Sequence, residues 1–270
     1  MFDFIFPQRR KRRRGIIQGI YGPMGAGKTD ELIRIVSRYK HGISEKFIVF
    51  TPKLNYREAG CIATHDRRTR LDAVTVDKVS DILNLVERAK YSLIAIDEIH
   101  FFHGEIIDFL LACPIEHTDV IWAGLDKDFR GLAFPLIGSD YTMRDLIGIT
   151  DFCIQKTALC DYQKNGTNCL APAIYSVRFI KEQNNRLTLA PYDDTTIAVG
   201  GKEGYASDKE EVTYVYGALC PKHTPILKGS PSRLSFRLLR SKENLNKRIH
   251  DGLHRDGKRL AEILDEFHKN

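Results

Sequence analysis

The sequence predicts an α/β fold in which helices cover a mostly parallel sheet. Two observations support this prediction: strand-like apolar runs alternate with helix-like segments over residues 15–150, and the first run leads through a glycine-rich turn into a helix. After Thr150 the pattern changes to short β-like pieces rich in turn residues, which predicts a smaller second unit up to about Thr224.

The predicted strands and helices follow one another along residues 15–150. The apolar runs expected to form the strands are 15–21, 47–51, 73–76, 91–96 and 119–124. Apolar residues at the spacing i, i+3, i+4 and i+7 predict two of the intervening helices. They are Leu32, Ile35, Val36 and Tyr39 in the first, and Val79, Ile82, Leu83 and Val86 in the second. A third helix is expected in "EIIDFLLACP", with Pro114 as its stop.

Composition is that of an ordinary globular protein. The 270 residues are 43% hydrophobic and 28% charged, and no apolar run approaches the ~20 residues that cross a bilayer. The apolar start "MFDFIFPQ" lacks preceding positive charges, so no secretory signal is predicted. Without such a signal, six scattered cysteines are typical of reduced thiols or metal ligands, and we expect a cytoplasmic protein.

The net charge of +6 is accounted for by one run, "RRKRRR" at residues 9–14. We expect residues 1–14 to form a solvated basic arm, because adjacent like charges repel one another. Such an arm can act as a nuclear-import signal, contact nucleic acid, or only aid solubility. Residues 225–270 form a polar extension whose last part has helical spacing, and we expect this helix to pack on the body or on a partner subunit.

The glycine-rich turn matches the phosphate-loop pattern G-x-x-x-x-G-K-[ST]. Glycines allow successive backbone N–H groups to converge on an anion, and the following helix adds its N-terminal partial positive charge. Lys28 is expected to reach the β- and γ-phosphates of ATP, and Thr29 to bind Mg²⁺. The residues expected to bind the nucleotide are Gly22, Pro23, Met24, Gly25, Ala26, Gly27, Lys28 and Thr29.

A second metal contact is predicted at the end of the strand in "YSLIAIDEIHFF". In phosphate-loop enzymes an Asp at such a strand end holds Mg²⁺, and this pattern assigns Asp97. The adjacent Glu98 can act as a general base on the attacking hydroxyl or water. The loop and the acid pair therefore predict an ATP- or GTP-binding enzyme, but they leave the phosphate acceptor open.

The phosphate acceptor can be predicted from a resemblance to a known family. Together, "GPMGAGKTDELIRIV", "THDRRT", "IDEIHFF" and "GLDKDFRGLAF" resemble the type II thymidine kinases, and "VGGKEGY" and "CPKH" extend the match to about residues 15–224. The family implies a RecA-like phosphate-loop domain over 15–150, a small zinc-binding lasso domain over 151–224 that closes over the nucleoside, and a homotetramer. It also implies transfer of the γ-phosphate of ATP to the 5′-hydroxyl of thymidine, with dTTP as feedback inhibitor.

Catalytic roles follow from the same resemblance. Glu98 aligns with the catalytic base, and Arg57 aligns with an Arg near the transferred phosphate. Asn55 stands where the family has an acidic residue, and His100 stands where it has Gln. An imidazole cannot reproduce the paired hydrogen bonds of an amide, so the second replacement can alter nucleoside selectivity.

Apolar and aromatic walls suit a flat base that carries a methyl group. The residues that align with the family's thymine and lasso contacts are Met24, Phe101, Leu125, Phe129, Phe134, Ser176 and Tyr205. Tyr216 is an alternative to Tyr205, because an insertion separates the two tyrosines and Tyr216 keeps the family's spacing to the next zinc ligand. Three further apolar residues nearby are expected to be core: Phe102, Leu132 and Ile137.

The resemblance also implies four zinc ligands in two pairs. The second pair, Cys220 and His223, has the C-x-x-H spacing of a structural site. The first pair would be Cys160 and Cys169 in "CDYQKNGTNC", a longer loop that an Asn-Gly turn can return to the metal. Cys153 is a rival ligand, but its apolar surroundings indicate a buried thiol.

Two other classes of function remain open from the sequence. A nucleic-acid-dependent ATPase would use Glu98 to activate water and would explain the basic run, but it leaves "GLDKDFRG" and the Cys/His residues without a role. A non-catalytic nucleotide sensor would keep the site without turnover, although Lys28, Thr29, Asp97 and Glu98 are all intact. The sequence favours an active thymidine kinase.

Overall fold

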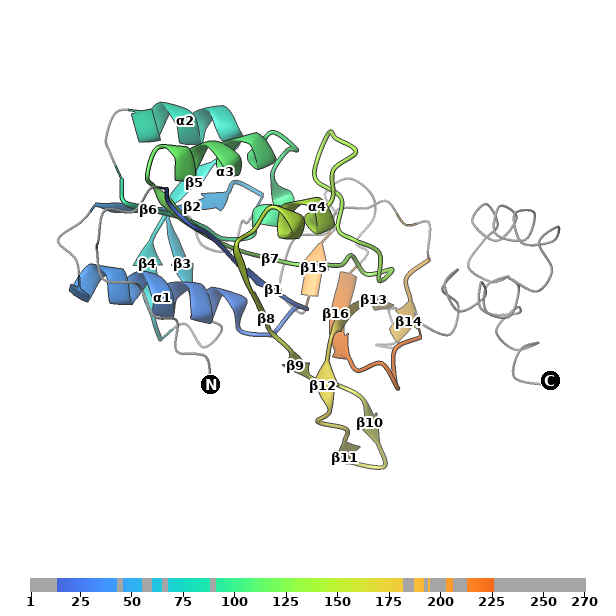
Figure 1. The fold of residues 1–270 in the computed structure, drawn as a ribbon. Coiled ribbons are helices and arrows are strands. Elements are labelled where there is room, and N and C mark those ends of the chain that lie inside the picture. Colours follow the sequence, from blue (N-terminus) through green and yellow to red (C-terminus); the bar gives the residue numbers. More distant parts are fainter. Residues whose placement is uncertain are drawn as a thin grey trace.

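A six-stranded parallel sheet forms the centre of the protein (Figure 1). The computed structural model describes residues 14–42, 46–54, 60–64, 68–87, 91–181, 187–191, 194, 203–205 and 213–225. The sheet has the order β5-β2-β6-β7-β1-β8, and its neighbouring strands pair in parallel. Its strands are β1 (Ile17–Tyr21), β2 (Phe47–Pro52), β5 (Val74–Val76), β6 (Leu93–Ile96), β7 (Asp119–Gly124) and β8 (Phe152–Gln155). The predicted α/β class is confirmed.

Five of these strands lie on the predicted apolar runs, whereas β8 was not predicted. It pairs with β1 in the register Gln18↔Phe152, so the sheet continues to Gln155, past the boundary expected at Thr150. As an edge strand, β8 exposes most of its side chains and lacks the pattern of a buried strand. The prediction of a buried thiol at Cys153 was wrong for the same reason, because this cysteine is exposed on the edge.

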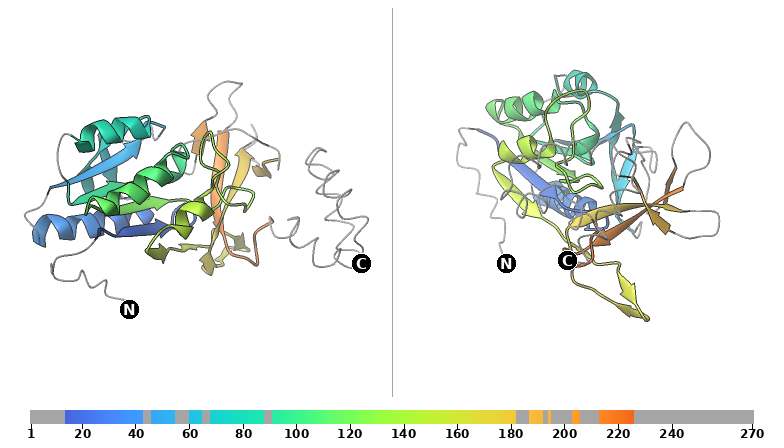
Figure 2. Two further views of the ribbon diagram at one scale, coloured as in Figure 1. Left: turned by 45° about the horizontal axis from the view of Figure 1, so that its top comes forward. Right: turned by 90° about the vertical axis from the view of Figure 1, so that its right-hand side faces the viewer.

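Helices cover both faces of the sheet (Figures 1 and 2). Helix α1 (Lys28–Gly42) lies on one face, and α2 (Val79–Glu87) and α3 (Ile106–Ile115) lie on the other. Successive side chains of a strand point to opposite faces, so in β6 Leu93 packs with α1 and Ile94 packs with α2 and α3. Pro114 lies inside α3, which ends one residue later than predicted.

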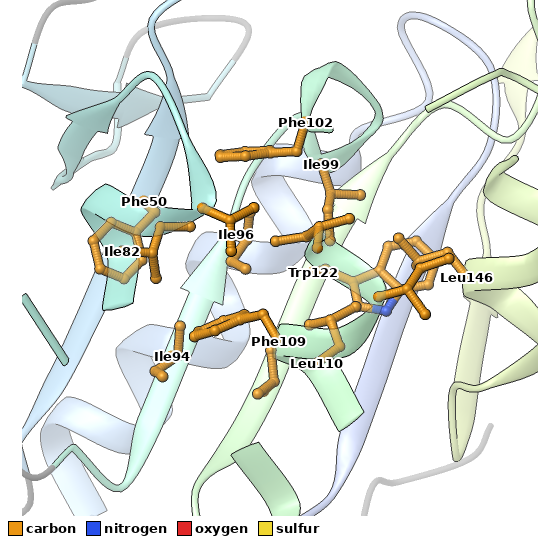
Figure 3. Packing of buried hydrophobic residues seen from close by; sticks show 14 of the residues in the cluster. Phe50, Ile82, Ile94, Ile96, Ile99, Phe102, Phe109, Leu110, Trp122 and Leu146 are labelled. Carbon is orange, nitrogen blue, oxygen red and sulfur yellow. The ribbon is translucent and has the colours of Figure 1, made fainter. Parts of the chain in front are cut away.

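The larger core cluster lies between the sheet and the helices α2, α3 and α4 (Met143–Gly148) (Figure 3). Trp122 is fully buried there, and its indole N–H donates to Thr150 Oγ1 at 3.1 Å. Phe102 belongs to this core as predicted, and Ile137 is half-buried. The core prediction for Leu132 was wrong, because its side chain is 44% exposed in the turn after β7.

The second unit is mostly antiparallel and follows β8. Its four-stranded sheet has the order β14-β13-β16-β15, made of β13 (Tyr175–Lys181), β14 (Leu187–Leu189), β15 (Glu203–Tyr205) and β16 (Thr213–Leu219). Strand β9 (Ala158–Leu159) pairs with β12 (Pro172–Ala173), and β10 (Gln163–Lys164) pairs with β11 (Thr167–Asn168). The β10–β11 hairpin extends away from the body (Figure 1), and its Asn-Gly turn has positive φ at both residues.

Short elements complete the body. Strands β3 (Cys61–Ala63) and β4 (Arg70–Asp72) form a hairpin beside α1, and the 3₁₀ turn η1 (Ile99–Phe101) follows β6. The predictions for residues 1–13 and for the C-terminal helix lie outside the described residues. Arg14, the last residue of the basic run, forms an ion pair with Asp151. Among the helices that the structure describes, none is both long and apolar enough to cross a membrane.

Two adjacent leucines of α3 test this packing. Leu110 is fully buried, whereas Leu111 is 46% exposed on the same helix. Leu110→Ala should lower the free energy of unfolding by about 2–5 kcal/mol, because it leaves a cavity in the core. Leu111→Ala should change it by less than about 0.5 kcal/mol. Urea titration of both variants provides the measurement, and equal losses would contradict the assigned faces of α3.

Candidate active site and metal centre

Three segments with predicted functional residues meet at the carboxyl edge of the sheet. Strands β6, β7 and β1 are neighbours in that order. The phosphate loop follows β1, Asp97 and Glu98 follow β6, and the segment 125–134 follows β7. Parallel strands end at the same edge, where open α/β sheets bind their ligands. The fold therefore brings together side chains that the sequence separates by about a hundred residues.

The phosphate loop has the backbone that its glycines allow. Gly27 has φ 68°, a left-handed conformation that favours glycine. A Cβ on Gly22 would lie 2.2 Å from the carbonyl oxygen of Lys156, so only glycine fits between the loop and the end of β8. The Lys28 ammonium donates to the carbonyl oxygen of Pro23 at 2.8 Å and so spans the loop.

Lys28 is a buried cation near several carboxylates. Burial lowers the pKa of its ammonium, and the charges of Glu98, Asp97 and Asp126 oppose that shift. Asp126 lies in the motif "GLDKDFRG", but the sequence predicted no role for it. Its position just after β7, beside the ends of β1 and β6, is the signal that identifies it as part of this group.

Thr29 and Asp97 form a compact set of oxygen atoms. The Thr29 hydroxyl lies 3.1 and 3.2 Å from the two carboxylate oxygens of Asp97. Burial, followed by the charge of Glu98, raises the pKa of Asp97 to about 7. A buried carboxylate beside a hydroxyl is a donor set that suits a hard divalent cation such as Mg²⁺. The residues present therefore fit the predicted magnesium contact.

Glu98 differs from its neighbour in conformation and in exposure. Its backbone is left-handed, with φ 49° and ψ 44°, a region that costs a non-glycine residue about 1–3 kcal/mol. The turn separates the two acids: the side chain of Glu98 is 29% exposed, whereas Asp97 is 3% exposed. Strain of this kind is concentrated at functional sites, so the geometry favours a functional role for Glu98.

His100 is buried and neutral. Its Nδ1 accepts a hydrogen bond from the Leu125 backbone N–H at 3.2 Å, which places the ring proton on Nε2. Burial and then the charge of Lys28 hold the pKa of His100 well below its usual value. Glu98 Oε2 lies 3.6 Å from the accepting Nδ1, so these two side chains form neither a hydrogen bond nor an ion pair.

The residues predicted to contact the base fall into two groups. Phe101 and Phe134 meet edge-to-face with ring centroids 6.1 Å apart, and both contact the ring of His100, which also holds the backbone of Leu125. Phe129 contacts the guanidinium of Arg178 on β13. Sequence reasoning missed Arg178, because β13 carries other polar residues and no local pattern distinguishes this arginine from them.

The phosphate loop and the second unit are in direct contact. The Met24 N–H donates to Ser176 Oγ on β13 at 2.8 Å. Ala26 is buried in the apolar cluster of the second unit, together with Cys160 and Cys220. Met24 and Ser176, both predicted to contact the nucleoside, are therefore brought together by the fold.

Three further residues were predicted or considered for the site: Arg57, Tyr205 and Tyr216. Arg57 lies outside the described residues. Tyr205 is in β15, where only the backbone is described. Its alternative, Tyr216, is in β16, and its hydroxyl accepts a hydrogen bond from Arg178 Nε at 2.8 Å. Tyr216 is therefore engaged in a part-buried contact with Arg178, and the choice between the two tyrosines stays a prediction.

The four predicted zinc ligands converge. The ligand atoms of Cys160, Cys169, Cys220 and His223 all lie within 4.8 Å of one another. Cys169 Sγ is 4.0 Å from Cys220 Sγ, and His223 Nδ1 is 3.4 Å from Cys220 Sγ. A tetrahedral zinc site with Zn–S bonds of ~2.3 Å has edges of ~3.8 Å. Both the residue types and their spacing fit zinc.

Local structure supports this cluster. The pKa of Cys220 is lowered: burial raises it, but backbone N–H groups of His223 and Lys222 and the neighbouring thiols outweigh that effect. The ring of Tyr162 stacks on His223 at 3.9 Å between centroids, and the Tyr162 carbonyl accepts from the Cys169 N–H. The longer loop thus returns its cysteine to the cluster and also supplies an aromatic contact to the histidine ligand.

Comparisons with known proteins agree on one family. The family model described as thymidine kinase matches residues 15–210. A thymidine kinase of Mycoplasmoides gallisepticum is 36% identical over 192 residues, which are 71% of this chain and 78% of that protein. A thymidine kinase of Ureaplasma parvum is 32% identical over 200 residues, which are 73% of this chain and 81% of that protein.

One solved structure is also similar. The Legionella pneumophila ATPase DotB aligns at 20% identity with a TM-score of 0.34, over 55% of this chain and 42% of that chain. A likeness this low supports no conclusion about fold or function.

Two cysteines provide a matched test of the metal centre. The purified protein should contain about one zinc ion per chain, held by the four converging ligands. Cys220→Ser should lose this zinc, whereas Cys153→Ser, on the exposed edge strand β8, should retain it. Elemental analysis by mass spectrometry gives both values. Equal zinc content in the two variants would contradict the assignment.

The buried carboxylate of Asp97 predicts a pH dependence of stability without metal. The pKa of Asp97 is raised from 3.8 to about 7. Between these two pH values the folded protein keeps a proton on Asp97 that the unfolded chain has released. Stability should therefore fall as the pH rises through this range, and the fall between about pH 5 and about pH 8 should be smaller in Asp97→Asn. Urea titration of Asp108→Asn, on the exposed face of α3, is the control. An Asp97→Asn profile that follows the unmodified protein would rule out this explanation.

Proposed function

The chain belongs to the thymidine kinase family, and on this premise we propose how its residues transfer the γ-phosphate of ATP to the 5′-hydroxyl of thymidine. The observation that carries the proposal is the meeting of the phosphate loop, the acid pair and the aromatic segment 125–134 at one edge of the sheet. A phosphate donor and a sugar hydroxyl must lie side by side for transfer, and this edge supplies contacts suited to each.

The donor side is formed by the phosphate loop. Its backbone N–H groups and Lys28 would bind the β- and γ-phosphates, because a buried ammonium next to these groups attracts a polyanion. Thr29 and Asp97 would hold Mg²⁺, which neutralises charge on the phosphates when bound. Arg57 would stabilise the charge of the transferring phosphate, an assignment that rests on the family resemblance.

Glu98 would take the proton from the 5′-hydroxyl. Its left-handed turn and partial exposure are those of a side chain that can reach a substrate from beside a metal ligand. As the proton leaves, the hydroxyl oxygen attacks the γ-phosphorus, the bond to the β-phosphate oxygen breaks, and ADP departs. Neutral His100 adds no positive charge beside this carboxylate.

The acceptor side would combine body and second unit. Phe101, Leu125, Phe134 and Phe129 would form apolar walls around thymine, and Met24 of the phosphate loop would add a contact to the base. The unit after β8 would act as the lasso domain, with Ser176 and Tyr205 facing the nucleoside. A zinc ion would fix the base of this unit, because it would join ligands from segments that are distant in sequence. These ligands would be Cys160, Cys169, Cys220 and His223.

Two further properties belong to the same proposal. We propose dTTP as a feedback inhibitor, since it carries both the base and a polyphosphate that the site accommodates. We also propose a homotetramer, on family resemblance. Competition of dTTP with thymidine, and the molar mass in solution by light scattering, test these two points separately.

The function is tested by a nucleoside panel with labelled ATP and magnesium. Thymidine should be converted to its monophosphate far faster than purine nucleosides, because the aromatic walls fit a methylated pyrimidine. ATP hydrolysis that DNA stimulates and thymidine does not would instead indicate a nucleic-acid-dependent ATPase. Tight nucleotide binding without any turnover would indicate a sensor.

Glu98→Gln isolates the proton-transfer step. The amide keeps the shape of the side chain but cannot accept the proton, so kcat should fall by about 10²–10⁴-fold. The KM for ATP should stay within about threefold, because the phosphate contacts are retained. Glu105→Gln, at an exposed carboxylate just before α3, should leave both constants unchanged. Parallel losses in kcat and in ATP binding would argue against Glu98 as the base.

A further inference from the structure

Arg178 is a buried cation enclosed by aromatic rings. It is 6% exposed and lies on β13 of the second unit. Its guanidinium carbon is 4.2 Å from the centroid of Phe129, 5.1 Å from that of Tyr214 and 5.4 Å from that of Tyr216. Ring faces attract a cation, and the attraction is stronger away from water.

Hydrogen bonds fix the plane of this guanidinium. Arg178 Nε donates to the Tyr216 hydroxyl at 2.8 Å, and Nη1 donates to Asp194 Oδ2 at 3.2 Å. Both Arg178 and Asp194 are nearly buried, so the ion pair is shielded from solvent. A planar guanidinium held by two partners has one orientation, and this orientation determines how a neighbouring ring can stack on it.

The partners of Arg178 come from two parts of the protein. Tyr214, Tyr216 and Asp194 belong to the second unit, whereas Phe129 belongs to the segment after β7 in the body. That segment is a tight turn, in which Asp128 accepts backbone N–H groups of Arg130 and Leu132. The turn constrains the backbone of Phe129. The centroid of its ring lies 4.2 Å from the guanidinium carbon of Arg178 and 5.8 Å from that of Arg130.

We propose that Arg178 is a positioning residue for the nucleoside, which acts by holding the ring of Phe129 in the orientation that receives the base. This inference rests on the proposed function, in which Phe129 is a wall of the thymine site. Arg178 itself would not touch thymidine. Its cage couples the second unit to the aromatic wall, so that the two form one surface.

Lysine cannot replace arginine here. An ammonium lacks the planar face that stacks on Phe129 and the fork that joins Tyr216 to Asp194. In Arg178→Lys, the KM for thymidine should rise by about tenfold, the scale of a desolvated cation–π contact, because the Phe129 ring loses the partner that orients it. The KM for ATP should remain unchanged. Arg144→Lys, at an exposed arginine on α4, is the matched control and should behave as the unmodified enzyme.

A double-mutant cycle separates positioning from general support of the fold. If Arg178 acts through Phe129, then Arg178→Lys should add little to the thymidine KM of Phe129→Leu, since the ring it orients is gone. Independent effects that multiply would overturn the proposal, and so would an unchanged KM in Arg178→Lys. Zinc content reports whether the second unit is intact. If Arg178→Lys loses zinc, Tyr216→Phe takes its place in the double-mutant cycle with Phe129→Leu, because it removes only the oxygen that accepts from Arg178.

Separate measurements distinguish an error in the proposed function from an error in the role of Arg178. If the unmodified enzyme makes no thymidylate and binds no thymidine by calorimetry, the proposed function is wrong and this inference falls with it. If the unmodified enzyme phosphorylates thymidine but the cycle is additive, only the role of Arg178 is wrong.

Discussion

The hydrogen bond from the Met24 N–H to Ser176 Oγ is the contact on which the rest of the site depends. It ties the phosphate loop to β13, and Ala26 reinforces it by packing among the residues around Cys160 and Cys220. A loop that must present several N–H groups to one anion gains from being held on both sides, because its own backbone supplies few contacts. The sheet holds one side and the second unit the other. The proposed zinc centre therefore supports the nucleotide site as well as the lasso.

The acid pair shows how one strand end can supply two different carboxylates. Asp97 continues the line of β6 and is buried beside Thr29 and Lys28, whereas the left-handed turn at Glu98 brings the next carboxylate toward solvent. Environments that differ this much allow adjacent acids to take different roles, one toward a metal and one toward a proton. The strain at Glu98 is the cost of this separation, and the packed core beneath η1 maintains it.

Local patterns predicted the parts of this site that depend on local sequence. The phosphate loop, the acids after β6 and the helical periods are each contained in one segment, and the ligand types in the Cys/His pairs are distinctive by themselves. The edge strand β8 was missed because half-exposed residues carry no apolar pattern, and Cys153 and Leu132 were misjudged because neighbours in sequence do not reveal burial. The Arg178 cage and the stack of Tyr162 on His223 join segments far apart in the chain, so no local pattern encodes them.

Strand β13 connects both halves of the proposed reaction. Ser176 and Arg178 stand two residues apart, so their side chains lie on the same face of the strand, about 7 Å from each other along it. The first contacts the phosphate loop and the second contacts Phe129, which places β13 against the donor side and the acceptor side at once. Because a strand in a four-stranded sheet hardly changes length, the distance between these two contacts is nearly fixed. In the proposed reaction, alignment of the γ-phosphate with a sugar hydroxyl requires a constant separation of this kind, and the spacing of two side chains on one strand would provide it.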